Sequence, residues 1–401
     1  MTTVFHVTLR PFLILSKCIG LIDISYTVKP TGLLIYNIKS VLHIFLEIIR
    51  FSVLLICNYM YIFQLNSEVH LIQIIGIVKF WIVIITARLS NNRIIEFING
   101  MIEFDRKLTP ISTSLLIQQH SLSKKHWDIF LISLFAYFIV FVSLRIFVSP
   151  WKTVNIFLSA HILFSPPFFL DFVVTSFLCF FLQNLQARFR TLNDFWKFLP
   201  AESVAVFNQW THIEIVFLME KMRLLHSELS ELLKKFTLGY GPLLLAFFTF
   251  NFSNLLIGFF FMVKIHPLSS KPTALDFKEQ IFTFIMYAQI VIFMLSVIVC
   301  VSLIDDQRTK IISYLRLYRI SNLHTDVKLQ IKMFMNQMSV FEFDQITAFG
   351  LFNVNLNLVV SILVLGITGI TTLVQMKHHP MIMTLNNDTK SYLTIAHKDV
   401  H

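Results

Sequence analysis

Charged residues are scarce in this sequence. They make up 14% of the 401 residues, whereas hydrophobic residues make up 56%, and the mean hydropathy is +0.71. A soluble globular chain has roughly 25% charged residues. The 43 phenylalanines would also give a soluble chain a large aggregation-prone surface. The composition therefore predicts an all-α, polytopic membrane protein whose outer surface faces lipid.

Paired cysteines and catalytic motifs are also missing. The four cysteines are Cys18, Cys57, Cys179 and Cys300. They lie singly in or beside apolar stretches and none belongs to a CxxC pair, so we expect buried thiols rather than a zinc site or a disulfide framework. The chain has no nucleophile elbow, phosphate loop or zinc-protease motif. We therefore expect neither an enzyme nor a cofactor or metal.

Seven apolar segments are long enough to cross a bilayer as helices. They are residues 41–65, 69–87, 127–148, 158–182, 242–263, 281–303 and 349–376. Pro242 suits the first turn of the fifth span. The connections before the fifth and seventh spans carry apolar residues at helical spacing among charged ones. We expect the fourth, fifth and sixth spans to extend into the cytoplasm as helices; the alternative is that these segments lie flat on the membrane surface.

Lys and Arg are divided unequally between the two sides of the predicted membrane. The side of the N-terminus has 23 of them and the opposite side has 7. Since cytoplasmic loops are enriched in Lys and Arg, residues 1–40 are expected to form a cytoplasmic tail and residues 377–401 an extracellular tail. Asn387, in the sequence Asn-Asp-Thr, would then be an external glycosylation candidate. Loop charge also accounts for the net charge of +10 without nucleic-acid binding.

One face of the last predicted span is polar. At about 100° per residue, seven polar side chains fall within an arc of about 100°. They are Asn353, Asn357, Ser361, Thr368, Thr371, Thr372 and Gln375. Asn355 points elsewhere. A lipid-facing helix gains nothing from such a stripe, so the stripe must face water, a partner helix or a pore.

Charged side chains inside the other spans are candidates for function, because burying them in a membrane is costly. Lys79 and Asp171 either neutralise each other within the bundle or contact a polar ligand. His43, Glu47 and Arg50 share one face of the first span, where we expect an internal ion pair that reaches the membrane interface.

The outer half of the fourth span is the expected ligand pocket, with Asp171 at its inner side. His161 and Ser165 lie beside Pro166 and Pro167, which break the helix. Broken helices expose backbone groups, and proteins tolerate these groups where they line a cavity. A kink that serves packing alone is the alternative. The external connections are short, so a ligand must bind among the spans.

The end of the last span resembles the signature of insect gustatory receptors, in the seven-span chemoreceptor superfamily. That signature is Thr-Tyr, five apolar residues, then Gln-Phe; here it is Thr368-Gly369, residues 370–374, then Gln375-Met376. Gly replaces Tyr and Met replaces Phe. Residues 346–355 and the helix 224–229 running into Gly239-Tyr-Gly241 also resemble the family. The tail after Met376 is longer than the family usually has.

The resemblance implies a gustatory chemoreceptor that acts as a ligand-gated, non-selective cation channel in the plasma membrane of a sensory dendrite. Four subunits, in a homo- or heterotetramer with other gustatory receptors, would line a central pore with their last spans, and a small-molecule tastant would bind in the outer half of each bundle. The implied pore-lining residues are Asn357, Ser361, Val364, Thr368, Thr372 and Gln375. Val364 is the main apolar interruption of the polar stripe, and four copies of it would form a dewetting gate.

Three other classes of membrane protein are alternatives to a gustatory receptor. An odorant receptor of the same superfamily shares the fold. A G-protein-coupled receptor needs an external N-terminus, opposite to the distribution of Lys and Arg. A secondary transporter favours repeated halves with matching broken helices, and only one broken span is evident here.

Overall fold

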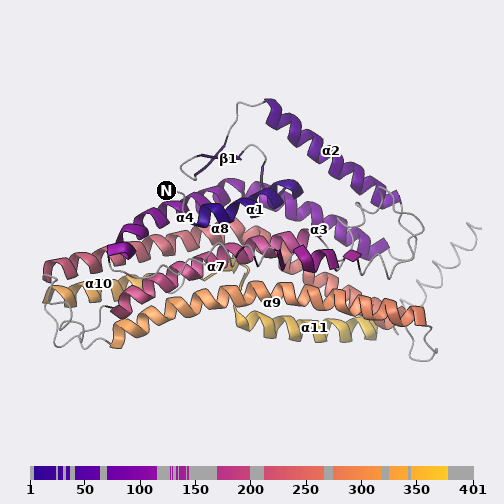
Figure 1. Cartoon of the computed structure of the whole chain (residues 1–401). Coiled ribbons are helices and arrows are strands. Elements are labelled where there is room, and N and C mark those ends of the chain that lie inside the picture. Colours follow the sequence, from indigo (N-terminus) through magenta and orange to yellow (C-terminus); the bar gives the residue numbers. More distant parts are fainter. Residues whose placement is uncertain are drawn as a thin grey trace, which may run out of the picture.

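Long helices lying side by side form most of the molecule (Figure 1). The computed structural model describes residues 4–23, 26–29, 33–36, 41–63, 70–114, 169–198, 212–265, 274–317, 325–341 and 345–377, with scattered helical positions between 127 and 143. The described helices are α1 (Val4–Ile19), α2 (Val41–Phe63), α3 (His70–Leu89), α4 (Asn91–Ser114), α7 (Phe169–Phe198), α8 (His212–Ile265), α9 (Ala274–Leu317), α10 (Thr325–Phe341) and α11 (Leu356–Lys377). Two short antiparallel pairs accompany them: β1 (Tyr26–Val28) with β2 (Leu34–Tyr36), and β3 (Thr347–Ala348) with β4 (Phe352–Asn353).

Several of these helices have the length and apolarity of membrane spans. Within the described residues, four stretches qualify: 42–62, 169–195, 213–259 and 284–313. The pair α3 and α4, bent by 60° at its break, qualifies as a fifth, and 356–372 is a shorter apolar helix. The predicted span 127–148 and the first part of 158–182 lie largely outside the described residues, so the count of seven stays a prediction.

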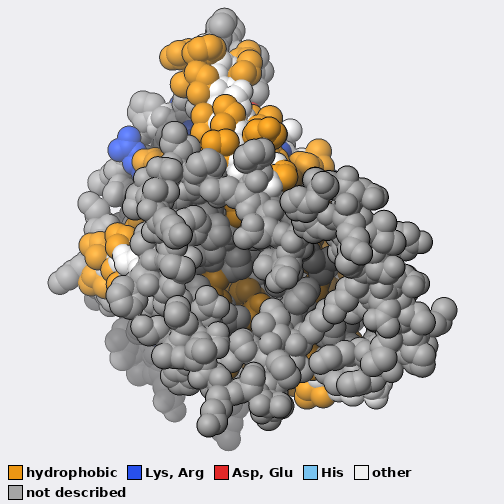
Figure 2. Space-filling model, turned by 90° about the vertical axis from the view of Figure 1, so that its right-hand side faces the viewer, with side chains coloured by type: hydrophobic (Ala, Val, Ile, Leu, Met, Phe, Trp, Pro, Cys, Tyr) orange, Lys and Arg blue, Asp and Glu red, His pale blue; other side chains and the backbone are white. Residues whose placement is uncertain are grey.

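α7 is the most deeply buried of these helices. It packs most extensively against α9, and α8 packs against α4 and α3 on another side of the bundle. Phenylalanines fill the space between them: Phe177 and Phe181 of α7 contact the ring of Tyr240 on α8. By contrast, α2 has many exposed hydrophobic side chains, and these project from the top of the molecule in Figure 2. Such a surface suits contact with lipid.

The N-terminal residues, predicted to form a cytoplasmic tail, include a helix that packs on the bundle. α1 packs against α7, and Phe12 lies on the ring of Phe180 with the ring centres 4.3 Å apart. Phe5, Leu9 and Phe12 are all buried, and their spacing is that of one helix face. This apolar face anchors α1 on α7.

α8 is one continuous helix of 54 residues, and Pro242 lies inside it rather than in its first turn. The expectation that Pro242 lies in a first helical turn is therefore wrong, whereas the point at which α8 enters the membrane stays a prediction. An interior proline costs about 3 kcal/mol in helix propensity, and the packing around Tyr240, which is fully buried, offsets that cost. α9 likewise continues for 44 residues. How far either helix extends beyond the membrane stays a prediction.

Candidate functional site

α11 has one packed face, and its polar side chains point away from that face. The half-buried positions are Leu358, Val359, Ile362, Gly366, Gly369 and Ile370. They face α8 and α9, the helices that α11 contacts. The exposed polar positions are Asn357, Ser361, Thr368, Thr371, Thr372 and Gln375. At about 100° per residue, the centres of the two sets are about 150° apart.

We call the six exposed polar residues of α11 the polar face. The hydroxyl groups of this face bond to their own helix: Thr368 Oγ1 donates to the carbonyl oxygen of Val364 at 2.9 Å, and Thr372 Oγ1 donates to that of Thr368 at 2.9 Å. Val364, 57% exposed, lies within the same face. The structure thus places all six predicted pore-lining residues on one exposed surface. It does not test their role in a pore.

α11 begins seven residues later than predicted. Residues 349–355 were predicted as its first turns. They instead form the turn between β3 and β4, the strand β4 itself, and the two residues that lead into α11. Asn353 lies in β4, so it does not belong to the helical stripe. Asn355 caps the helix, because its Oδ1 accepts a hydrogen bond from the backbone N–H of Leu358 at 3.2 Å.

The hairpin turns because two consecutive residues adopt left-handed backbone angles. φ is 53° at Phe349 and 75° at Gly350. The turn also lies directly against α8: a Cβ added at Gly241 would be 3.1 Å from the backbone nitrogen of Phe349. Glycine at this position of α8 therefore permits the close approach that places the start of α11.

Lys79 and Asp171 form an ion pair inside the bundle. Lys79 Nζ of α3 contacts Asp171 Oδ2 of α7 and donates a hydrogen bond to Asn251 Oδ1 of α8 at 2.7 Å. The exposed fractions of the three residues are 1%, 3% and 0%. The predicted neutralisation of Lys79 by Asp171 is therefore confirmed. Contact of either residue with a ligand is untested.

Asn251 was not expected at this site. It lies in the sequence Asn-Phe-Ser, which has the pattern of a glycosylation acceptor. Its full burial and its bond to Lys79 exclude a glycan and give the side chain a structural role. The remaining pocket candidates, His161 and Ser165, lie outside the described residues, as does the glycosylation candidate Asn387.

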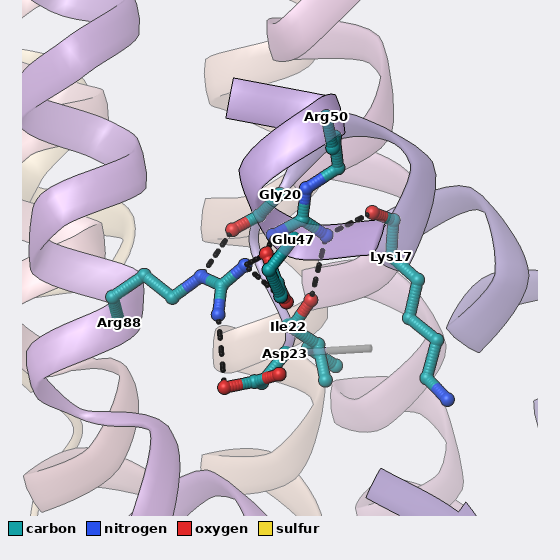
Figure 3. A network of polar contacts seen from close by, with 7 residues as sticks. All are labelled: Lys17, Gly20, Ile22, Asp23, Glu47, Arg50 and Arg88. Carbon is teal, nitrogen blue, oxygen red and sulfur yellow. Dashed lines mark hydrogen bonds and ion pairs between the residues drawn. The ribbon is translucent and has the colours of Figure 1, made fainter. Parts of the chain in front are cut away.

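A second charged network joins three segments near the N-terminus (Figure 3). Arg50 pairs with Glu47 on α2, as predicted, and donates to the carbonyl oxygen of Lys17 at 2.6 Å. Arg88 of α3 contacts Glu47 at 3.2 Å and Asp23 at 3.3 Å.

The spacing of residues along α2 could not predict the contacts that Arg50 and Glu47 make with other segments. Arg88 also donates to the carbonyl oxygen of Gly20 at 2.7 Å. Both arginines therefore hold backbone oxygens at the C-terminal end of α1, where positive charge is favourable. His43 is not among the residues of this network. The network fixes α1 to α2 and α3.

His226 is buried in the charged half of α8, between the rings of Phe189 and Phe334. Residues 214–235 of this helix carry many charged side chains, so we expect the later, apolar part of the 213–259 stretch to be the part that crosses the membrane. Burial, with the charge of Arg308 acting in the same direction, lowers the pKa of His226 from 6.5 to about 3. The imidazole is thus neutral at physiological pH.

The sequence and the fold both resemble those of known membrane receptors. The family model described as 7tm Chemosensory receptor matches residues 9–378 of this chain. The insect olfactory receptor OR5 from Machilis hrabei, solved in complex with eugenol, aligns at 13% identity over 92% of this chain and 99% of its own, with a TM-score of 0.56. A second structure of that receptor aligns at 12% identity with the same coverage and a TM-score of 0.50. No curated protein matches the chain. With its apolar helices, these matches make the chain a multi-pass membrane protein.

Proposed function

Since this chain belongs to the 7tm chemosensory receptor family, we propose that it is a gustatory receptor that acts as a ligand-gated, non-selective cation channel. The observation that carries this proposal is the polar face of α11. Six polar side chains are exposed on the side of α11 opposite the face that packs on α8 and α9. A polar surface at membrane depth needs water or a partner.

A pore between copies of the chain satisfies that need. Four chains, whether identical or from different gustatory receptors, would turn their polar faces toward a common axis. The exposed apolar side chains of α11 beside that face, which include Leu356, Val360, Leu363 and Ile367, would then contact lipid or a neighbouring subunit. Val364 would narrow the path as an apolar ring that excludes water when the channel is closed.

The tastant site of the proposal lies around Asp171. Lys79, Asp171 and Asn251 come from three helices that meet in the bundle, so a ligand that alters their contacts would shift α3, α7 and α8 relative to one another. α8 contacts α11 and the hairpin before it. A displacement of α8 would therefore reach the start of the proposed pore helix.

Recording of membrane current tests the proposal. Cells expressing the chain should show a cation current in response to at least one compound of a tastant panel that includes sugars, bitter compounds and amino acids. Gln375→Ala and Thr368→Ala should change relative ion permeability or rectification. Ile367→Ala, on the exposed apolar side of α11, is the matched control and should leave permeability unchanged.

Two outcomes would reject parts of the proposal. A ligand-evoked current whose permeability ignores Gln375→Ala, Thr368→Ala and Val364→Ala would remove α11 as the pore lining. Substrate uptake without current would favour a transporter instead.

An odorant receptor is the second candidate, because the similar solved structure is that of an olfactory receptor bound to eugenol. The same recordings distinguish the two roles if volatile aromatic compounds are added to the panel. A current evoked by volatile compounds alone would favour the odorant role. In either role we expect the chain in the plasma membrane of a sensory dendrite, which surface labelling of the expressed protein begins to test.

A further inference from the structure

Two of the four cysteines lie where α7 packs against α9. Cys179 lies on α7 and Cys300 on α9, and both are buried. Gln183, one turn after Cys179 on the same side of α7, donates from Nε2 to Cys300 Sγ at 4.0 Å. Cys300 Sγ therefore lies against the turn of α7 that runs from Cys179 to Gln183. α7 and α9 form the most extensive helix contact of the described fold, so this turn of α7 is held against α9.

One of the two thiols has a polar neighbour. Gln183 offers an amide N–H to Cys300. A donor to sulfur favours the anionic form, which is the nucleophile in thiol chemistry. Cys18 and Cys57 have no such arrangement among the described residues: Cys18 is exposed, and both are remote in sequence from α7 and α9. A merely space-filling cysteine needs no polar neighbours.

We propose that Cys179 and Cys300 form an oxidisable dithiol, which hydrogen peroxide converts into a disulfide that joins α7 to α9. In the first step the Cys300 sulfur attacks one peroxide oxygen and the O–O bond breaks, which gives a Cys300 sulfenic acid and one water molecule. In the second step the Cys179 sulfur attacks the Cys300 sulfur. The S–S bond forms, the hydroxyl group leaves with the thiol proton as water, and the two thiols together have supplied two electrons to the peroxide.

The disulfide would restrict movement between two helices that carry different parts of the protein. α7 carries Asp171, and α9 contacts α11. Hydrogen peroxide is small and uncharged, so it can reach thiols that lie within a helix bundle, whereas larger oxidants cannot. A dithiol reductant reverses the bond by exchange.

Mapping of disulfides in the full-length chain tests the proposal. The chain is exposed to hydrogen peroxide in membranes, its free thiols are blocked with an alkylating reagent, and peptides are separated by mass spectrometry without reduction. The expected result is a linked pair of peptides that contain Cys179 and Cys300, with alkylatable thiols falling from four per chain to two. Dithiothreitol should restore all four.

Variants provide the matched control. The double variant Cys18→Ser/Cys57→Ser keeps the proposed pair and should still form the linked peptides, while Cys179→Ser should form none. Thermal unfolding in detergent adds a second readout, because a cross-link raises the unfolding temperature: peroxide should raise it for the double variant and not for Cys179→Ser.

The proposal is overturned if peroxide leaves both Cys179 and Cys300 alkylatable, if each is oxidised separately, or if the only disulfides join different chains. None of these readouts requires a ligand or a current, so they stand or fall independently of the proposed channel activity.

Discussion

α7 and α11 are both apolar helices that carry polar side chains, but they use them in opposite ways. Polar groups on α7 are buried and bind other helices: Asp171 pairs with Lys79, and Arg188 contacts Asp105 of α4 at 2.9 and 2.6 Å. The hydroxyl groups on α11 are exposed and bond only to their own helix backbone in the interactions described. Interior polar groups therefore hold the fold together, whereas the polar face of α11 is free for another purpose.

The largest expected effect concerns the interior ion pair. Asp171→Ala leaves the charge of Lys79 buried without its partner, and removal of one member of a buried pair costs about 3–5 kcal/mol. We expect a large drop in the thermal unfolding temperature of the solubilised chain. The double variant Lys79→Met/Asp171→Leu replaces both charges by apolar groups and should recover much of the loss. If Asp171→Ala unfolds at the temperature of the unaltered chain, α7 is not held by this pair.

Acidification should destabilise the folded chain through the buried His226. The pKa of His226 is about 3 in the folded chain, below the value of about 6.5 in an unfolded chain. The folded state therefore binds fewer protons than the unfolded state. The stability that neutral His226 contributes is fully present above pH 6.5 and is lost as pH falls toward 3. At pH 5 the loss is about 2 kcal/mol.

The control for this pH dependence is His226→Leu, which removes the ionisable group and keeps an apolar side chain between Phe189 and Phe334. Unfolding temperature measured at pH 7.0 and pH 5.0 (roughly the range in which His titrates) should fall less in the variant than in the unaltered chain. An equal fall in both would assign the acid sensitivity to other groups.

The polar face of α11 should tolerate substitution without loss of stability. Thr372→Ala and Gln375→Ala remove exposed side chains, and such surface changes usually alter the free energy of unfolding by less than about 0.5 kcal/mol. If either variant lowers the unfolding temperature as much as Asp171→Ala does, the polar face is part of the core of the folded chain and the contrast between the helices disappears.

On the packed face of α11 we expect a gain in stability instead of a loss. A Cβ added at Gly369 would lie 2.9 Å from Cδ2 of Leu256, the flexible end of a side chain, whereas one added at Gly366 meets nothing within 4 Å. Gly366→Ala should therefore gain up to about 1 kcal/mol of helix propensity, and Gly369→Ala should gain less. Comparison of the two unfolding temperatures checks the order; a larger gain for Gly369→Ala would contradict the packing of α11 on α8.

The same position bears on the family signature. Gly369 stands where the signature has Tyr. It lies on the packed face of α11, half-buried against Leu256. A tyrosine at this point would require Leu256 and its neighbours to move. The departure from the signature thus changes helix packing and leaves the polar face intact.

Much of the architecture was readable in the sequence because membrane helices are set by local chemistry. A run of apolar residues must satisfy its backbone hydrogen bonds internally, so helices follow from composition and length. The side of α11 that holds polar residues follows from helical periodicity alone. The pairing of Lys79 with Asp171 follows from the cost of isolated charges inside apolar helices.

Only the tertiary structure decided the points at which distant segments meet. It showed that α1 belongs to the core, that α8 runs through Pro242, and that α11 starts at Leu356, because each depends on contacts with other helices. Asn251 and Arg88 contact residues that lie far away in sequence, and Cys300 lies beside the turn of α7 that follows Cys179. Sequence periodicity determines which face of a helix is polar, but close packing determines what that face touches.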